Sequence, residues 1–245
     1  MKSATVRKLH RWIGLLFSVS TLTASVSGVF HTIMSRTQAP PPIHARPEPI
    51  RANGVGYPLE KVLSEHPGAT KVDLRMIRGE PWYQVTRNPG EPLVYVSATD
   101  GRVDATADEV YAKQIAETFL GNPALEKTDY LTAFDREYIA IFRILPVYRF
   151  ACDDGRKTRV YVSTSTGTVT RHTDRGRQFE ADVFSLLHKL AFIPDKTWRD
   201  WVLVGLTSGI ALVSVLGIVL FFATRPRRAR LGAGRPGEDG GERGI

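Results

Sequence analysis

The sequence contains a single cysteine, Cys152, so the chain cannot form an internal disulfide bond. It also lacks the HExxH, CxxC, Walker and GxSxG motifs. The carboxylates of the central part are scattered and mostly sit near basic residues, as on a solvated surface. The fold must therefore be held by its own core, and no hydrolytic or transferase site is recognisable. Cys152 is expected to be a small buried side chain on a strand, or else to pair with another chain.

Charge is absent from two long runs near the ends of the chain. Residues 12–34 contain no Asp, Glu, Lys or Arg, and residues 201–223 form a second run of this kind. At about 1.5 Å per residue, the first run makes a helix of roughly 34 Å, enough to cross a bilayer core of about 30 Å. We therefore expect transmembrane helices at 12–34 and 201–223. A cleaved signal peptide is the alternative for the first run, but its usual apolar region of about 7–15 residues is shorter, which favours a retained anchor.

The basic excess of the chain is concentrated in its two tails. The net charge of +8 divides into +4 for residues 1–35, +1 for residues 36–200 and +3 for residues 201–245. Because basic residues are retained on the cytoplasmic side of a membrane, we expect segments 1–11 and 224–245 to be cytoplasmic. The middle of the chain is then exported from a bacterial inner membrane, and the glycine-rich tail is expected to be disordered. The nearly neutral middle argues against a nucleic-acid partner, whereas lipid headgroups account for the basic tails.

Both runs carry features that are typical of membrane helices. Three tryptophans are expected to act as interfacial anchors: Trp12, Trp198 and Trp201. Small residues let membrane helices approach closely, either within one chain or in a homodimer. The candidates for such packing are Ser20, Ala24 and Ser27 in the first run and Gly205, Gly209 and Gly217 in the second.

The middle of the chain contains a proline-rich linker and an internal repeat. Six prolines between residues 40 and 58 predict an extended spacer over 35–57. The sequence VYVS at 94–97 recurs at 160–163, and the offset of 66 residues also relates Gly101 to Gly167. Just upstream, residues 81–83 match 146–148 at an offset of 65, a slip of one residue.

Each copy of the repeat is expected to be a helix followed by an antiparallel meander of strands, over residues 58–106 and 107–176. The second copy is expected to contain an extra strand at 138–144. The fold class is therefore α+β, with two transmembrane helices flanking an exported domain of two repeats. After the repeats, residues 177–194 predict an amphipathic helix along the bilayer surface. Its apolar side comprises Phe179, Val183, Phe184, Leu187, Leu190 and Ala191.

Several motifs, in their order, resemble those of PepSY-domain membrane proteins. They are LHRWIGL opening the first run, SGVFH closing it, VYVSxxxGxV in both copies, LPVYRF before the last hairpin and LLHKLAF before the second run. Over residues 7–224 the chain is most similar to the two-span form with PepSY-associated transmembrane helices. The resemblance implies exported modules of a helix packed on a small antiparallel sheet. Some relatives are associated with peptidases, which they are thought to hold inactive. Others, with four or more spans, are iron-regulated and resemble haem-bearing reductases in siderophore iron release, but the two spans here do not imply a complete four-helix haem site.

Three of the six histidines border the expected membrane spans and are candidate haem ligands: His10, His31 and His188. The other three are expected to be solvated: His44, His66 and His172. Haem iron in membrane cytochromes is commonly held by two imidazoles, and haem b could lie between His31 and His188, or between His31 and its copy in a dimer. Interfacial anchoring is the alternative role of these side chains.

Two functions remain open from the sequence. The first is an accessory membrane protein whose exported domain binds a protein partner, and which carries electrons through haem in iron or redox metabolism. The second is a binding module without cofactor that inhibits or regulates a peptidase or sensor. On the first hypothesis the protein is at most one component of a membrane reductase.

Overall fold

The computed structural model describes residues 3–38, 48–50, 54–88 and 90–223. Most of the expected linker, with His44, and the expected cytoplasmic tail at 224–245 lie outside the described residues. The elements, in chain order, are α1 (Ser3–Thr37), α2 (Leu59–Glu65), β1 (Lys71–Ile77), β2 (Glu80–Thr86), β3 (Val94–Ser97), α3 (Ala107–Leu120), β4 (Leu125–Leu131), η2 (Ala140–Phe142), β5 (Val147–Cys152), β6 (Arg159–Ser163), β7 (Thr168–Thr173), α4 (Arg175–Leu187) and α5 (Lys196–Ala223). The chain divides into two compact units, residues 1–28 with 186–245 and residues 29–185.

The two long helices, α1 and α5, are candidate membrane spans. They contain 35 and 28 residues, and their apolar windows are almost entirely exposed. Hydroxyl groups within α1 donate to carbonyl oxygens three or four residues earlier, as Ser18 does to Leu15 and Thr23 to Val19. These bonds satisfy the polar side chains without water. Length and composition therefore indicate a membrane protein with two spanning helices, as the uncharged runs predict.

Within the unit formed by residues 1–28 and 186–245, glycines of α5 pack against α1. Gly209 lies so close to the ring of Phe17 that a Cβ atom at position 209 would clash with it. Gly217 lies against the ring of His10, whose nearest atom would be 3.3 Å from a Cβ at position 217. Gly205 has open space at the same position. Of the three glycines predicted to mediate helix packing, Gly209 and Gly217 therefore lie at this contact and Gly205 does not.

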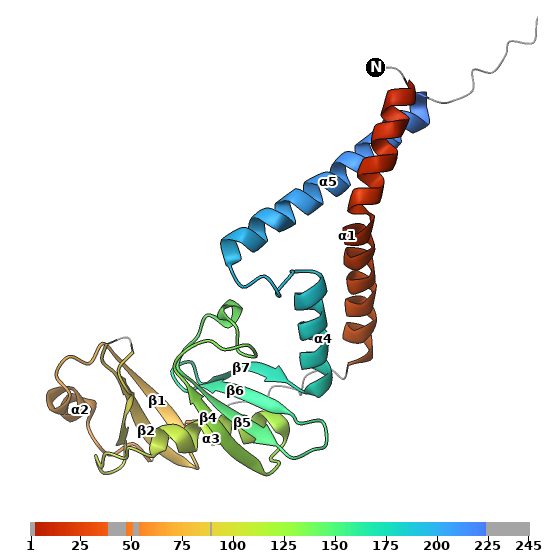
Figure 1. Ribbon diagram of the computed structural model, residues 1–245. Helices are drawn as coiled ribbons and strands as arrows, with labels where there is room; N and C mark the ends of the chain where they lie inside the picture. Colours follow the sequence, from red (N-terminus) through yellow and green to blue (C-terminus); the bar gives the residue numbers. More distant parts are fainter. Residues whose placement is uncertain (1–2, 39–47, 51–53, 89, 224–245) are drawn as a thin grey trace, which may run out of the picture. The chain divides into compact units, whose positions relative to one another are not determined.

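The unit formed by residues 29–185 contains two antiparallel sheets, which correspond to the two copies of the sequence repeat (Figure 1). The first sheet has the order β1-β2-β3 and follows α2. The second has the order β4-β5-β6-β7 and follows α3. The fold is therefore α+β, with two small antiparallel sheets between the two apolar helices.

Equivalent residues of the two copies form the same turn. The N–H of Gly101 donates to the carbonyl of Ser97 at 3.0 Å, and the N–H of Gly167 donates to that of Ser163 at 2.9 Å. Both glycines have positive φ, 82° and 68°, a conformation that side chains disfavour. This requirement explains why glycine recurs after each VYVS segment.

The register of the strands accounts for the slip of one residue between the two offsets. Tyr83 lies opposite Val96 in the first sheet, and Tyr148 lies opposite Val162 in the second. The tyrosines are 65 residues apart and the valines 66. The second copy therefore has one additional residue in the connection between β5 and β6.

The predicted strand at 138–144 does not form. These residues belong to a loop between β4 and β5 that contains the single turn η2. The side chain of Asp135 accepts hydrogen bonds from the N–H groups of Glu137 and Tyr138, at 2.8 and 2.5 Å, and these bonds curl the chain. The strand of the second copy that has no complete equivalent in the first copy is β7. At the corresponding place the first sheet has only a single bridge, between Val96 and Val103.

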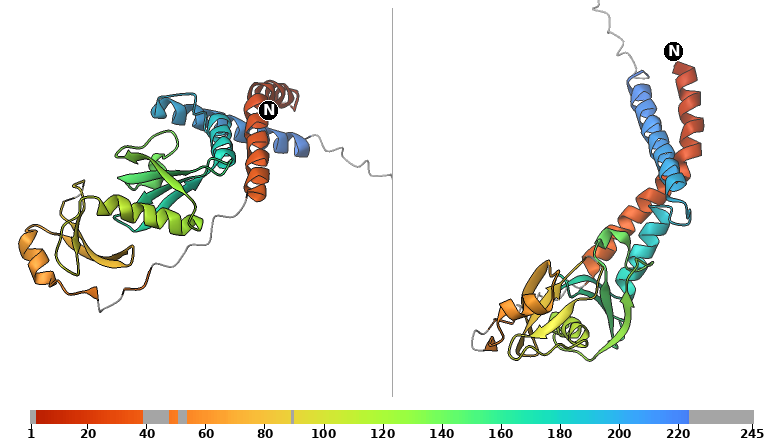
Figure 2. Two further views of the ribbon diagram at one scale, coloured as in Figure 1. Left: turned by 90° about the horizontal axis from the view of Figure 1, so that it is seen from below. Right: turned by 90° about the vertical axis from the view of Figure 1, so that its left-hand side faces the viewer.

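Helix α3 packs on both sheets and joins the two copies (Figure 2). One side of the helix, at Ala112, Ala116 and Phe119, packs on the second sheet. The other, at Ala107 and Tyr111, packs on the first sheet, whose opposite face is covered by Val62 of α2. The opposite face of the second sheet is covered by the loop between β4 and β5, where Tyr138 is fully buried.

Candidate functional site

Glu180 of α4 is a buried carboxylate held by the last turns of α1. Its side chain is bonded at 2.5 Å to Nδ1 of His31, and it also accepts hydrogen bonds from the Ser35 hydroxyl at 3.3 Å and from the Gln38 amide. Glu180 is only 8% exposed. Because a buried carboxylate needs partners, these three contacts fix α4 to the end of α1 within one unit. We call this group the Glu180 cluster.

Aromatic side chains complete the contact between α4 and α1. The ring of Phe184 lies 4.9 Å from the ring of His31, and Phe179 packs edge-on against Phe30 at 6.1 Å. The helix is shorter than the segment 177–194 predicted from its apolar periodicity. It ends at Leu187, and Leu190 has a φ of 51°, which no helix accommodates. Leu190 and Ala191 are therefore not on the apolar side of this helix.

His31 has the environment that suits a metal-ligating histidine. Glu180 fixes the orientation of the imidazole through Nδ1, and the remaining ring nitrogen is Nε2. The side chain is about half exposed, at 49%. Metal-ligating histidines almost always bond a carboxylate or carbonyl through their second nitrogen, which fixes the tautomer. The bond to Glu180 therefore fixes the ring of His31 and leaves Nε2 on the side away from the carboxylate.

His188 and His10 lie in the other unit, in different surroundings. Nδ1 of His188 is 3.0 Å from the hydroxyl of Ser27, which is completely buried. The Nδ1 atom of His10 is buried without a hydrogen-bond partner beside Gly217. Among the residues that the structure describes, no group of three or more metal-ligating side chains occurs.

The remaining side chains predicted to serve the membrane spans are placed as follows. Trp12, Trp198 and Trp201 are all exposed, at 56%, 70% and 67%. Ser20 and Ala24 are partly buried, and the Ser20 hydroxyl donates to the carbonyl of its own helix at Phe17. The exposed indoles are free to contact lipid, as interfacial anchors do.

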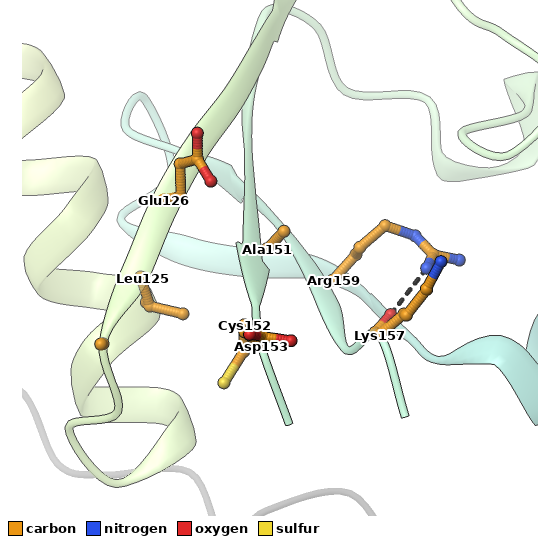
Figure 3. A pocket seen from close by; sticks show the side chains of 8 residues that line it. Leu125, Glu126, Ala151, Cys152, Asp153, Lys157 and Arg159 are labelled. Atoms are coloured by element: carbon orange, nitrogen blue, oxygen red, sulfur yellow. Dashed lines mark hydrogen bonds between the residues drawn. The ribbon is translucent and has the colours of Figure 1, made fainter. Parts of the chain in front are cut away.

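A pocket of about 570 Å³ lies in the second sheet where β4 begins (Figure 3). It is lined by Ala124, Leu125, Glu126, Ala151, Cys152, Asp153, Lys157 and Arg159. Figure 3 shows Arg159 turned toward the backbone oxygen of Lys157, to which it donates a hydrogen bond of 2.6 Å. Burial, and then the nearby Asp154 and Asp153, raise the pKa of the Cys152 thiol, which makes it a poor nucleophile.

The strand next to this pocket, β4, is an edge strand with backbone groups directed away from the sheet. The N–H of Cys152 on β5 donates to the carbonyl of Thr158, toward β6. Its opposite residue on β4, Leu125, is therefore in a non-hydrogen-bonded pair, and so is Lys127 opposite Phe150. The backbone N–H and C=O groups of Leu125 and Lys127 consequently point outward, next to the pocket.

A charged network lies on the face of the second sheet that the loop between β4 and β5 covers. Glu137 of the loop accepts hydrogen bonds from Arg159 at 2.6 and 2.7 Å and from the hydroxyl of Tyr161 at 2.5 Å. Burial alone would raise the pKa of Glu137, but these hydrogen bonds outweigh it and hold the pKa below its ordinary value. Arg171, also on this face, has its pKa lowered by burial. The network fixes the loop to the sheet.

The Glu180 cluster and the edge of β4 were not identified from the sequence. A signal for the cluster exists, because Glu180 lies one turn before Phe184 on the apolar side of an amphipathic helix, where a carboxylate needs a partner. The edge of β4 has no such signal, since its sequence, LEKTDYL, does not reveal which neighbour pairs with it.

No protein-family model, curated protein or solved structure matches this chain.

Proposed function

We propose that this chain is a membrane-anchored binding protein whose central domain is exported and captures an extended segment of another exported protein. On this proposal the domain consists of two PepSY-like repeats, and the captured protein is a peptidase or a sensor that the binding restrains. The observation that carries the proposal is the outward-facing backbone of β4 beside a pocket. An extended peptide can add a strand to such an edge while a neighbouring pocket receives one of its side chains.

The composition of the pocket supports an apolar side chain with polar flanks as its occupant. Leu125, Ala151 and Cys152 contribute apolar surface. The charged lining residues balance, with Glu126 and Asp153 acidic and Lys157 and Arg159 basic, so neither a strongly acidic nor a strongly basic segment is favoured. The bulge in β4 between Lys127 and Asp129 would limit the added strand to the first half of the edge.

Export of the domain is supported by the distribution of charge along the chain. The four basic residues before the first span and the net +3 of residues 201–245 favour cytoplasmic tails. With two spans, both tails lie on one side and the domain between them on the other, in a bacterial inner membrane.

The experiment compares two substitutions of one residue, Lys127→Pro and Lys127→Ala. Both remove the ion pair between Lys127 and Glu109, but only proline removes the outward N–H. A photocrosslinking amino acid at Glu126 first identifies the captured segment in membranes, and binding of that synthetic segment to the detergent-solubilised chain is then measured by fluorescence anisotropy. Losing one interstrand hydrogen bond costs about 1–3 kcal/mol, so Lys127→Pro should weaken binding roughly tenfold and Lys127→Ala much less.

Equal binding by Lys127→Pro and the unmodified chain would refute strand addition at β4. Equal losses in both variants would assign the effect to the side chain rather than the backbone. Because proline is tolerated at an edge position whose N–H points away from the sheet, the fold of both variants should be retained, which circular dichroism checks.

A second candidate function, haem-dependent electron transfer, is favoured by the bond between His31 and Glu180. In this role His31 would ligate iron through Nε2, while Glu180 would orient the ring and increase its basicity. Haem would supply one-electron transfer, and a second copy of the chain would contribute the other imidazole. Purified protein expressed with added haem should then show a Soret band that sharpens on reduction and is lost in His31→Ala. A folded but colourless protein contradicts this function.

A further inference from the structure

The loop between β4 and β5 is an insertion specific to the second copy of the repeat. It comprises residues 132–146, whereas Arg78 and Gly79 alone connect the corresponding strands β1 and β2. The loop exposes apolar side chains at Phe134, Ile139 and Ile141, of which Ile141 is 69% exposed. Long loops in compact domains commonly have a functional reason, and three exposed apolar side chains on one loop make it a candidate contact surface.

The base of this loop is rigid, so its tip is held outward. Tyr138 is completely buried and stacks on Tyr161 at 4.8 Å and on Phe142 at 5.0 Å. Its hydroxyl donates to the carbonyl of Ile144 at 3.0 Å. Between these fixed points lies the single turn η2, which contains the exposed Ile141. The loop is the green segment beside β7 in Figure 1.

The attachment of the loop to α4 relates it to the end of a membrane span. Arg136 of the loop forms an ion pair of 3.0 Å with Asp182 of α4. Two residues earlier, Glu180 is bonded to His31 and Ser35 of α1. His31 and Ser35 lie on either side of position 34, where the uncharged run of α1 ends. The loop, α4 and these two residues all belong to one unit. The loop is therefore tied to α4 at the level where the span leaves the bilayer core.

The reach and charge of the loop tip both suit the membrane interface. Ile141 is five residues from Arg136, so its backbone lies at most about 17 Å from the anchored position. The headgroup regions of a bilayer add roughly 5–8 Å on each side of the apolar core. Arg143, two residues beyond Ile141, is exposed. An apolar tip beside a basic side chain is the combination that binds the surface of membranes containing anionic lipid.

We propose that the 132–146 loop dips into the lipid headgroup region, with Ile141 as its inserted side chain and Arg143 on anionic headgroups. The domain then has a third contact with the membrane besides its two spans. This contact limits rotation of the domain about α1 and fixes which of its surfaces faces away from the bilayer.

The test places an environment-sensitive NBD fluorophore on the full-length chain, reconstituted at one copy per nanodisc. Single cysteines are introduced by Ile141→Cys or, as the control, Leu63→Cys, in a chain that carries Cys152→Ser. Leu63 is an exposed residue of α2 in the other copy of the repeat, at 47% exposure. With spin-labelled lipid in the disc, we expect at least twofold stronger quenching and a blue-shifted emission for position 141.

Quenching at position 141 that does not exceed that at position 63 would overturn the proposal. The proposal would also be overturned if the emission at position 141 shows no blue shift at one copy per disc but shifts when the protein is concentrated in detergent. In that case the loop would bind a second copy of the chain rather than lipid. The charge is tested by Arg143→Gln, which should reduce the gain in quenching when phosphatidylglycerol replaces phosphatidylcholine. An unchanged gain in this variant would refute the role of Arg143.

Discussion

Replacement of Glu137 by glutamine tests whether the charged network holds the 132–146 loop on the second sheet. Glu137 accepts two hydrogen bonds from Arg159 and one from Tyr161. Both charged side chains are largely buried, at 18% and 20% exposure. Glutamine keeps the shape of the side chain but removes the charge and one acceptor, which leaves Arg159 without its counter-ion.

The expected loss of stability follows from these contacts. Breaking a buried ion pair by removing one partner costs about 3–5 kcal/mol, and residual exposure of this pair lowers the value to roughly 3 kcal/mol. In a domain of this size, 1 kcal/mol corresponds to a shift of about 2–4 °C in Tm. Glu137→Gln should therefore lower the Tm of the central domain by roughly 6–12 °C.

The assay is thermal unfolding of the full chain in detergent, followed by near-ultraviolet circular dichroism of its tyrosines and tryptophans. The matched control is Glu126→Gln, at an exposed position of β4, which should change the Tm by less than about 2 °C. Equal shifts in the two variants would refute the reasoning.

The same comparison has a predicted dependence on pH. Because the pKa of Glu137 is lowered in the folded chain, its stabilising effect is fully present above the ordinary pKa of 4.5. It is lost as the pH falls through the lower, folded-state pKa. The Tm difference between the unmodified chain and Glu137→Gln should therefore narrow as the pH drops below about 4.5, and a constant difference would contradict the assignment.

Three further substitutions or reactions test other contacts. Gly209→Leu should separate the two spans and lower the Tm in detergent by several degrees. Gly205→Leu should leave the Tm unchanged, because there is open space at the Cβ position of residue 205. Equal changes in Tm would contradict the helix contact. Gly101→Ala should lower the free energy of chemical unfolding clearly more than Gly79→Ala does. Both glycines have positive φ, but of the two only Gly101 lacks room for a Cβ atom. Equal losses of unfolding free energy would argue against this crowding. Cys152 should react with a disulfide reagent at pH 8 more slowly than free cysteine, since burial raises the pKa of its thiol. A rate equal to that of free cysteine would contradict this environment.

The sequence was sufficient to predict the two apolar helices and the class of the domain between them. The uncharged run at residues 12–34 is long enough to predict a membrane span. The sequence VYVS, with a glycine four residues after it, occurs twice and predicts a strand followed by a tight turn in each copy. The structure has both strands and both turns at the expected residues. These features were predictable because the physical requirement is local: length of apolar helix in one case, positive φ in the other.

The features that escaped prediction depend on tertiary contacts. The 138–144 segment, YIAIFRI, is rich in the aromatic and β-branched residues typical of a strand, but Asp135 and the stacking of Tyr138 hold it in a loop. The partner of Glu180 lies about 150 residues away, so neither helix alone specifies the pair. The end of α4 at Leu187 was missed because apolar periodicity continues past it, while the backbone at Leu190 turns left-handed.

The proposed function depends most directly on export of the domain between the two spans. The measurement is labelling of single cysteines by a membrane-impermeant maleimide in cells whose outer membrane has been permeabilised, in a chain carrying Cys152→Ser. Leu63→Cys, in the domain, should be labelled before lysis, and Ser3→Cys, at the start of α1, only after lysis. The reverse pattern would place the domain in the cytoplasm and contradict the binding of an exported partner.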